Sequence, residues 1–583
     1  MKSRASLQHN HPSHFGESVN LLDCCFSFAE KARTTVQREL ATEKSHAPCS
    51  MCSKQATSQQ CPLPREVRST PKNACRYLDH RTKGFYTKDA GCVYRRNLTL
   101  LREMLLNDDT TFEVVWSNDS KSKISYECGR LYFNNYRRCY TSQQAIPRLL
   151  YDSPRHLLAW KIDDALFLQS PLGSSLPSPS DQKPCLLTIT IGSWLKRVCP
   201  QTGQMLQMVY LSSRHKYRYL EWDTAQETFY AKSTQWKPRE AGVDYWVDNL
   251  MNLAVFQAFP LKIIGVMEIN KRVFGSTVVD VVLNQGVLAV SHRNMSVKLY
   301  SFHRILQMFR KQDLILGEPC NINGSEGVVG EHPFGIPSNI HITEAPPVLF
   351  EVSSQAGMQI GGNPFHFVYT PCGKRFKGAH HVCSLKDRTL AKNGVQDIDC
   401  CSVESDSIYF HPDNSSRIIQ HAPNTINVLK IMTEWGGGNQ SEIIKDFSIS
   451  AQRGQNAASK VTVTSSGRTV KRRVYQLDDD PENETFRSVE YEDELDLLQV
   501  VVSHREEAGG ASVCLHDNNT GALLKRIPLL EPLDETFPHE IILDRDTIVH
   551  IQQRNNSLFC CRVYKMTPRR MGSDDDGAEE KTR

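Results

Sequence analysis

Short runs of alternating apolar and polar residues dominate the chain from about residue 111 to residue 567. Leu186 to Leu211 contains three such runs separated by turn residues, and Ala511 to Leu529 repeats its second half, with Thr520-Gly521 aligned on Thr202-Gly203. Alternation with period two predicts half-buried β-strands, and a glycine at the bend predicts a tight hairpin. The span is therefore predicted to be all-β and built of recurring hairpins.

Hairpins that recur along a long chain predict a β-propeller, in which the sheets form a closed ring of blades. Plain blades take roughly 40–50 residues, so about 450 residues with long intervening loops predict a single propeller of about seven irregular blades. Such blades cannot bury their faces alone, and closure of the ring stabilises them. A pair of β-sandwiches would need a linker near the middle of the chain, and no segment has that composition.

One amphipathic helix is predicted ahead of the strands, within residues 84–110. Between Gly91 and Asn107, four apolar residues recur at helical spacing and share one face: Tyr94, Leu98, Leu101 and Leu105. A lone amphipathic helix ahead of a propeller must pack on the outside of the ring or dock into a partner.

The two ends of the chain differ from the strand-rich span. Residues 1–83 are polar without a sustained apolar period, and residues 568–583 form an acidic tail, so both are predicted to be disordered. Cys49 and Cys52 have the spacing of half a zinc site. No matching second pair follows them, and a flexible tail of free thiols is the alternative.

Charge and cysteine usage narrow the class of protein. Lys and Arg number 69 against 65 Asp and Glu, a net charge of +4 over 583 residues, which predicts neither direct nucleic-acid binding nor strong membrane attraction. The first 20 residues lack the apolar core of a secretory signal, so the 19 cysteines are expected to be reduced, in the cytosol or nucleus.

The best candidate for a membrane span is the apolar stretch from Leu253 to Ile269. Pro260 and Lys262 interrupt it, and a spanning helix needs roughly 20 mostly apolar residues. We expect two buried strands with a turn between them, and no transmembrane segment.

The sequence contains no recognisable catalytic or cofactor-binding motif. It has no P-loop, no GxSxG elbow and no HExxH helix, and no Cys/His series with the spacing of a RING domain. A propeller without catalytic residues is usually a recognition platform. We therefore expect a non-enzymatic protein without a cofactor.

Several long strings resemble the DDB- and cullin-4-associated factor family, from about Gly84 to the C-terminal region. They include YTKDAGCVYRRNL, MEINKRVFG, LFEVSSQAGMQIGG and YEDELDLL. The resemblance implies a substrate receptor of an E3 ubiquitin ligase, which binds a DDB-type triple-propeller adaptor and, through it, cullin-4 and a RING subunit. It also implies a nuclear, nucleolar location. Two alternatives are a nucleolar propeller scaffold unrelated to ubiquitin and a metal-dependent propeller hydrolase.

The resemblance also implies where the adaptor is held. Many receptors of this wider family use a Trp-Asp-x-Arg motif, but Trp222-Asp223 is followed by Ala225 at the arginine position, and a blade-stabilising pair is the alternative. Other receptors use a helix ahead of the propeller, which makes Tyr94, Leu98, Leu101 and Leu105 the first choice for docking in a groove. The alternative is an outer helix that caps the ring. Arg137 and Arg138 are candidate polar anchors, or else a simple exposed strand end.

Overall fold

The computed structural model describes residues 88–568 with interruptions. The gaps are 155–157, 169–184, 224–227, 235–248, 323, 363–364, 372–378, 387, 398–406, 414, 433–440, 452–461, 464–468, 471–483, 505–509, 534–536 and 556–557. The predicted disordered region 1–83, the zinc candidates Cys49 and Cys52, and the acidic tail beyond Pro568 all lie outside the described residues.

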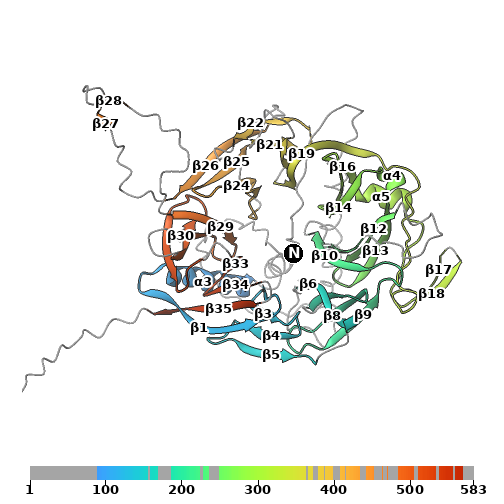
Figure 1. Ribbon diagram of the computed structural model, residues 1–583, viewed down its shortest axis with the longest axis horizontal. Helices are drawn as coiled ribbons and strands as arrows, with labels where there is room; N and C mark the ends of the chain where they lie inside the picture. Colours follow the sequence, from blue (N-terminus) through green and yellow to red (C-terminus); the bar gives the residue numbers. More distant parts are fainter. Residues whose placement is uncertain are drawn as a thin grey trace, which may run out of the picture.

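The sheets form a ring in sequence order, which confirms the predicted all-β propeller (Figure 1). Three separate four-stranded sheets follow one another along the chain. They are β2 (Ser125–Glu127), β3 (Arg130–Phe133), β4 (Arg138–Thr141) and β5 (Arg148–Asp152); β6 (Ile162–Leu168), β7 (Cys185–Thr190), β8 (Trp194–Val198) and β9 (Met205–Tyr210); and β10 (Tyr217–Asp223), β11 (Thr228–Ser233), β12 (Asn249–Gln257) and β13 (Lys262–Asn270).

The next three units share one eleven-stranded sheet. The strand β19 is unusually long, because its first part pairs with β16 and its second part with β20. A single parallel pairing, Lys392 with Glu442, joins β22 to β26. The strands are β14 (Val278–Asn284), β15 (Val287–His292), β16 (Ser296–Ser301), β19 (Val348–Gly361), β20 (His366–Pro371), β21 (Ala379–Ser384), β22 (Leu390–Asp397), β23 (Ser407–Phe410), β24 (Arg417–His421), β25 (Thr425–Met432) and β26 (Glu442–Ser450).

Two more four-stranded sheets complete the ring, and the last one closes it. Their strands are β29 (Glu484–Glu492), β30 (Leu497–His504), β31 (Ala511–Asp517) and β32 (Leu523–Leu529), followed by β33 (His539–Asp544), β34 (Thr547–Asn555), β35 (Leu558–Pro568) and β1 (Thr110–Ser120). The first strand of the chain, β1, pairs with the last, β35, from Thr110 opposite Pro568 to Ser120 opposite Phe559. The two ends of the propeller thus lie in one sheet.

The described residues give eight four-stranded units, where about seven blades were expected. Five are separate sheets and three are sections of the eleven-stranded sheet, with β19 counted in two of them. Spacing of strand patterns in the sequence cannot show that one strand serves two units. Two short hairpins project from the ring, β17 (Pro319–Ile322) with β18 (Ser325–Val328) and β27 (Thr462–Val463) with β28 (Thr469–Val470) (Figure 1).

Two turns that the sequence aligned have the same backbone geometry. Gly203 has φ +71° and donates its N–H to the carbonyl of Cys199 at 2.9 Å, while Gly521 has φ +72° and donates to Asp517 at 2.9 Å. Glycine reaches this left-handed region without the strain that a Cβ causes. The hairpin prediction is confirmed at both positions.

The apolar stretch from Leu253 to Ile269 forms the two buried strands that the sequence predicted. It spans most of β12 and β13, which pair antiparallel around the turn that contains Pro260. Among the described residues, no helix has the length and apolar content needed to cross a bilayer.

A long insertion follows β16 and packs on the outer edge of the ring. It begins with the helix α5 (Phe302–Phe309) and returns along earlier units: Ile340 pairs with Met267 of β13, and Tyr210 of β9 donates its N–H to the carbonyl of Gly330 at 2.7 Å. Leu314, Val329 and Ile336 of the insertion join the apolar core around β6 to β13. The insertion therefore extends the surface of units that precede it in the chain.

Antiparallel strands place the turns of each unit on two faces of the ring. The turns between first and second strands, such as Cys128-Gly129 and Asp544 to Thr547, lie on one face, together with Leu101 of the helix α3 (Lys88–Leu106). We call it the α3 face. The turns between second and third strands, such as Ile191 to Ser193, and the links between units lie on the opposite face.

Candidate functional site

The helix α3 packs with its apolar side on the seam between the last two sheets (Figure 1). Leu105 is fully buried there, and Leu98, Leu101 and Leu106 pack against the same cluster. Its members come from both sheets and include Leu497, Val513, Leu515, Leu543, Ile548 and Phe112. The helix therefore covers the place where the ring closes.

Polar contacts attach the C-terminal end of α3 to the strands β31 and β32. Arg102 forms an ion pair with Asp517 at 3.2 Å. The Lys525 ammonium donates to the carbonyls of Asn107 at 2.6 Å and of Thr110 at 2.8 Å. Both carbonyls follow Leu106, the last residue of α3, so the ammonium lies near the negative end of the helix dipole.

The predicted docking face of the helix is the face that packs on the ring. Leu98, Leu101 and Leu105 contact the propeller core, as in the alternative of an outer helix. Of Tyr94 the structure describes only the backbone, which lies in α3. The side of α3 that faces outward carries Leu100 and Met104, which are 47% and 55% exposed.

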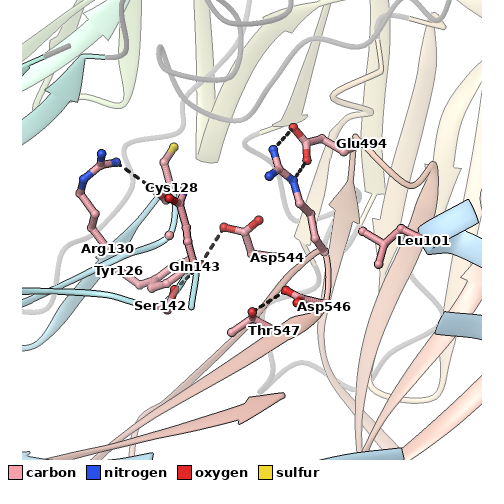
Figure 2. A pocket seen from close by; sticks show the side chains of 12 residues that line it. Leu101, Tyr126, Cys128, Arg130, Ser142, Gln143, Glu494, Asp544, Asp546 and Thr547 are labelled. Atoms are coloured by element: carbon pink, nitrogen blue, oxygen red, sulfur yellow. Dashed lines mark hydrogen bonds and ion pairs between the residues drawn. The ribbon is translucent and has the colours of Figure 1, made fainter. Parts of the chain in front are cut away.

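A pocket of about 460 Å³ lies on the α3 face, between α3 and the turns of three sheets. Figure 2 shows Leu101 on one side, Arg130 and Cys128 on the other, and Asp544 between them. The remaining walls come from the turns after β29 and β33 and from the end of β4, with Glu494, Arg545, Asp546 and Ser142. The pocket is mostly polar, with both signs of charge.

The charged groups of the pocket are paired with one another across unit boundaries. Tyr126 of β2 donates to Asp544 at 2.7 Å, and burial together with the charge of Asp544 raises the pKa of Tyr126 well above its ordinary value, so the hydroxyl stays protonated. Arg545 pairs with Glu494 of the preceding sheet. These contacts join three units and preorganise the rim of the pocket.

The described residues contain no group of three or more His, Cys, Asp or Glu side chains placed to hold a metal ion. The ionisable groups of the pocket are paired with one another, as Tyr126 is with Asp544 and Arg545 with Glu494, which gives the pocket a fixed polar rim.

Trp222 and Asp223 lie at the end of β10 and connect two units. Asp223 is fully buried and accepts the backbone N–H groups of Gln285 at 2.9 Å and Gly286 at 3.0 Å, in the first turn of the next unit. Trp222 packs against the core around β6 to β13. The geometry is that of the blade-stabilising pair, and it places neither side chain near α3.

Arg137 and Arg138 lie at the turn between β3 and β4, on the opposite face from α3. Arg138 contacts Asp152 through two nitrogens at 2.8 and 2.6 Å, and Arg137 reaches the same carboxylate at 3.4 Å. The hydrogen bond from Arg138 lowers the pKa of Asp152. The structure therefore brings none of the predicted arginine or Trp-Asp positions together with the helix.

The pocket residues Tyr126, Glu494, Asp544 and Arg545 were not predicted as a site. Tyr126 lies in β2, more than 350 residues before Glu494, Asp544 and Arg545, which lie between β29 and β34. The acidic run around Glu494 was visible in the sequence, but acidic loops are usually solvated, and no local signal pairs this one with Arg545.

Comparison with known proteins places the chain. The family model described as DDB1- and CUL4-associated factor 17 matches residues 96–566. A protein of that name from Danio rerio is 56% identical over 517 residues, which covers 87% of this chain and 98% of the relative. The Homo sapiens protein of the same name is 47% identical over 517 residues, covering 88% of this chain and 98% of the relative.

Solved propellers are much more distant. The C-terminal WD40 domain of Sif2 covers 78% of this chain and 98% of its own, with 8% identity and a TM-score of 0.38, too low to bear on function. The family match spans most of the described propeller together with part of α3, and the relatives match along nearly their whole length. The chain therefore belongs to the DDB1- and CUL4-associated factor 17 family.

Proposed function

We propose that the chain is a non-catalytic substrate receptor of a cullin-4 ubiquitin ligase, which a DDB-type adaptor holds by the outward side of α3. The relatives are named for association with DDB1 and CUL4. In this proposal the adaptor brings cullin-4 and the RING subunit that recruits the transfer machinery, and the propeller brings the substrate. The proposal includes a nuclear, nucleolar site of action.

The observation that carries the docking site is an apolar surface on a rigidly held helix. Leu100 and Met104 are four residues apart, so they share one side of α3. Their helix is anchored by Leu105 in the core and by Arg102 on Asp517, so it loses little freedom when a partner binds.

The neighbouring strand extends this surface. Lys525 of β32 contacts the end of α3, and the two residues before it, Leu523 and Leu524, are 45% and 37% exposed. A helix side with two apolar anchors beside an apolar strand end matches the helix-in-groove mode of recognition. The first-choice residues Leu98, Leu101 and Leu105 then act indirectly, because they hold the helix on the ring.

The test is adaptor binding by paired surface variants. Leu100→Asp with Met104→Asp should weaken binding of the purified adaptor by at least about thirtyfold, because apolar anchors at interface centres carry most of the affinity. The control, Ile146→Asp with Leu149→Asp, changes two residues that are also about half exposed but lie near β5. Its binding should match that of the unchanged chain.

Two outcomes would contradict parts of the proposal. Equal binding by both double variants would move the adaptor contact away from α3. If the unchanged chain purified from cells carries neither adaptor nor cullin-4, and blocking cullin activation alters no partner's half-life, the receptor role fails and the scaffold alternative gains.

A further inference from the structure

Aromatic rings gather on the opposite face of the ring, at the unit formed by β6 to β9. Trp160, in the short 3-10 helix Leu158–Trp160, stacks on Trp194 of β8 with ring centroids 5.7 Å apart. The ring of His332, from the long insertion, is stacked 6.2 Å from Trp194 and lies 4.7 Å from Tyr210 of β9. We call these four residues the aromatic stack.

The insertion is fixed where it supplies His332 to the stack. Ile336 donates to the carbonyl of Leu211 at 2.9 Å, and Gly330 donates to Gly335 at 2.8 Å, which closes the turn that contains His332. Gly335 has φ +74°, and a Cβ there would lie 2.8 Å from the backbone oxygen of Leu211. The histidine is therefore held beside β9 by backbone contacts that a side chain at residue 335 would disturb.

The stack is accessible and has an apolar border. Trp160 and Trp194 are half-buried, His332 is exposed, and Leu158, two residues before Trp160, is 74% exposed. Large aromatic side chains on a preorganised surface are the residue types that dominate binding energy at protein interfaces.

Cations surround the stack on the segments that form it. Lys196 places its ammonium 3.9 Å from the centroid of the Trp160 ring. Lys161 follows Trp160 directly, and Arg214 and Lys216 lie in the link after β9, where Ser193 donates to the carbonyl of His215 at 3.0 Å. Residues 158–161, 191–196, 211–216 and 330–336 contain these four cations and one carboxylate, Glu331, and the charge of Arg214 also acts on Glu268 of β13.

We infer that the aromatic stack and its cationic border form a binding surface for an acidic peptide segment that carries an aromatic, leucine or proline side chain. The apolar side chain packs against Leu158 and the ring edges, and the flanking carboxylates pair with Lys161 and Lys216. Charge complementarity of this kind directs both the choice of partner and its rate of encounter.

A single-stranded nucleic acid would also be attracted by these cations, but the way in which the aromatic rings stack on one another favours a peptide. Proteins that bind single strands stack bases on open ring faces. Here Trp160 is engaged by Trp194 and by the Lys196 ammonium, and Trp194 is engaged by Trp160, Tyr210 and His332. The rings pair with one another, which leaves edges and the aliphatic border for contact.

This surface stands apart from adaptor docking, since α3 lies on the other face and at the closing seam. Peptide binding does not depend on the ligase proposal. The identification of the peptide as part of a substrate does rest on it, and the two can fail separately.

The experiment selects random 12-residue peptides displayed on phage against the full chain and measures the enriched sequences as synthetic peptides. We expect Asp and Glu on both sides of Trp, Phe, Leu or Pro. Lys161→Glu with Lys216→Glu should weaken their binding by about tenfold or more, and Trp160→Ala by a similar factor. The charge control is Lys430→Glu with Lys445→Glu, two exposed lysines on β25 and β26, which should bind like the unchanged chain.

Because Trp160→Ala could loosen its 3-10 turn, the lysine pair decides the outcome. The inference would be overturned if the selected peptides were not enriched in Asp and Glu. It would also be overturned if Lys161→Glu with Lys216→Glu bound the peptides as tightly as the unchanged chain. A labelled 12-nucleotide oligouridine that binds the unchanged chain and is lost in both the lysine and Trp160 variants would replace the peptide with a nucleic acid. Adaptor binding by the same variants should stay unchanged, which separates this result from the ligase proposal.

Discussion

Arg545 and Glu494 form a two-point ion pair across the seam between the last two sheets of the ring. The Arg545 Nη2 atom lies 2.8 Å from Glu494 Oε1, and Nε contacts Oε2. The Glu494 side chain is only 5% exposed, whereas Arg545 is 39% exposed. Both residues come from turns on the α3 face, next to the helix that covers the same seam.

Removing one partner of this pair should weaken the closure of the ring. Glu494→Gln leaves the volume unchanged but removes the charge, and we expect a loss of about 1–2 kcal/mol in the free energy of unfolding, reduced by the exposure of Arg545. Adding Arg545→Met should recover part of that loss, because the double variant no longer leaves an uncompensated guanidinium. Urea unfolding of Glu494→Gln, of Arg545→Met and of the double variant measures the coupling, and strictly additive losses would mean that the pair contributes nothing.

Substitutions on the buried side of α3 should lower the stability of the fold, whereas substitutions on its outward side should not. Leu105→Ala removes a fully buried side chain from the seam cluster and should cost about 2–4 kcal/mol. Leu100→Ala on the outward side should leave the free energy of unfolding within about 0.5 kcal/mol of that of the unchanged chain. Thermal unfolding of the two variants checks this, and a large loss from Leu100→Ala would show that the outward side also packs.

Asp223 should matter for folding and not for adaptor binding. Asp223→Ala leaves the partly buried N–H groups of Gln285 and Gly286 without these acceptors, at a cost of about 2–4 kcal/mol. Asp223→Asn keeps one acceptor oxygen and should lose less. If the folded Asn variant binds the adaptor normally, the Trp-Asp pair is structural, and a selective loss of adaptor binding would restore it as a contact.

His550 should make the closing sheet sensitive to acid. Burial, with smaller contributions from the charges of His539 and Arg562, lowers the pKa of His550 to about 3. The unfolded chain takes up this proton near pH 6.5, so stability is complete above that pH and falls as pH drops toward 3. Between pH 7 and pH 5 the loss from this group is about 2 kcal/mol.

The measurement for His550 is the change in urea midpoint between pH 7 and pH 5. His550→Leu should show a smaller change than the unchanged chain, whatever its stability at pH 7. An identical change in both proteins would assign the acid sensitivity to other groups.

Local patterns in the sequence predicted the local parts of the fold. The glycines at 203 and 521 indicated hairpins because the turn needs a positive φ, and Pro260 with Lys262 marked the turn between β12 and β13. The predicted number of units was too low, because it came from the length of the strand-rich span with an allowance for long loops, and β19 runs through two units as its partner changes from β16 to β20. A strand pattern reports burial but not the identity of the neighbouring strand.

The site was less predictable, for a similar reason. The apolar side of α3 shows that the helix packs against another apolar surface. The sequence alone does not distinguish the propeller from a partner protein as the source of that surface. The pocket depends on contacts such as Tyr126 with Asp544, which are 418 residues apart and carry no local signal. The aromatic stack likewise needs His332 from an insertion that returns to β9, a path that strand periodicity does not encode.

The continuous strand β19 has a consequence for how the ring opens. Units joined only by loops can exchange their amide hydrogens independently, but β19 supplies the fourth strand of one unit and the first strand of the next. Local opening of either unit must then fray the same backbone. The amides of β14 to β16 and of β19 to β22 should therefore exchange together, as one cooperative arc on the side of the ring away from the closure.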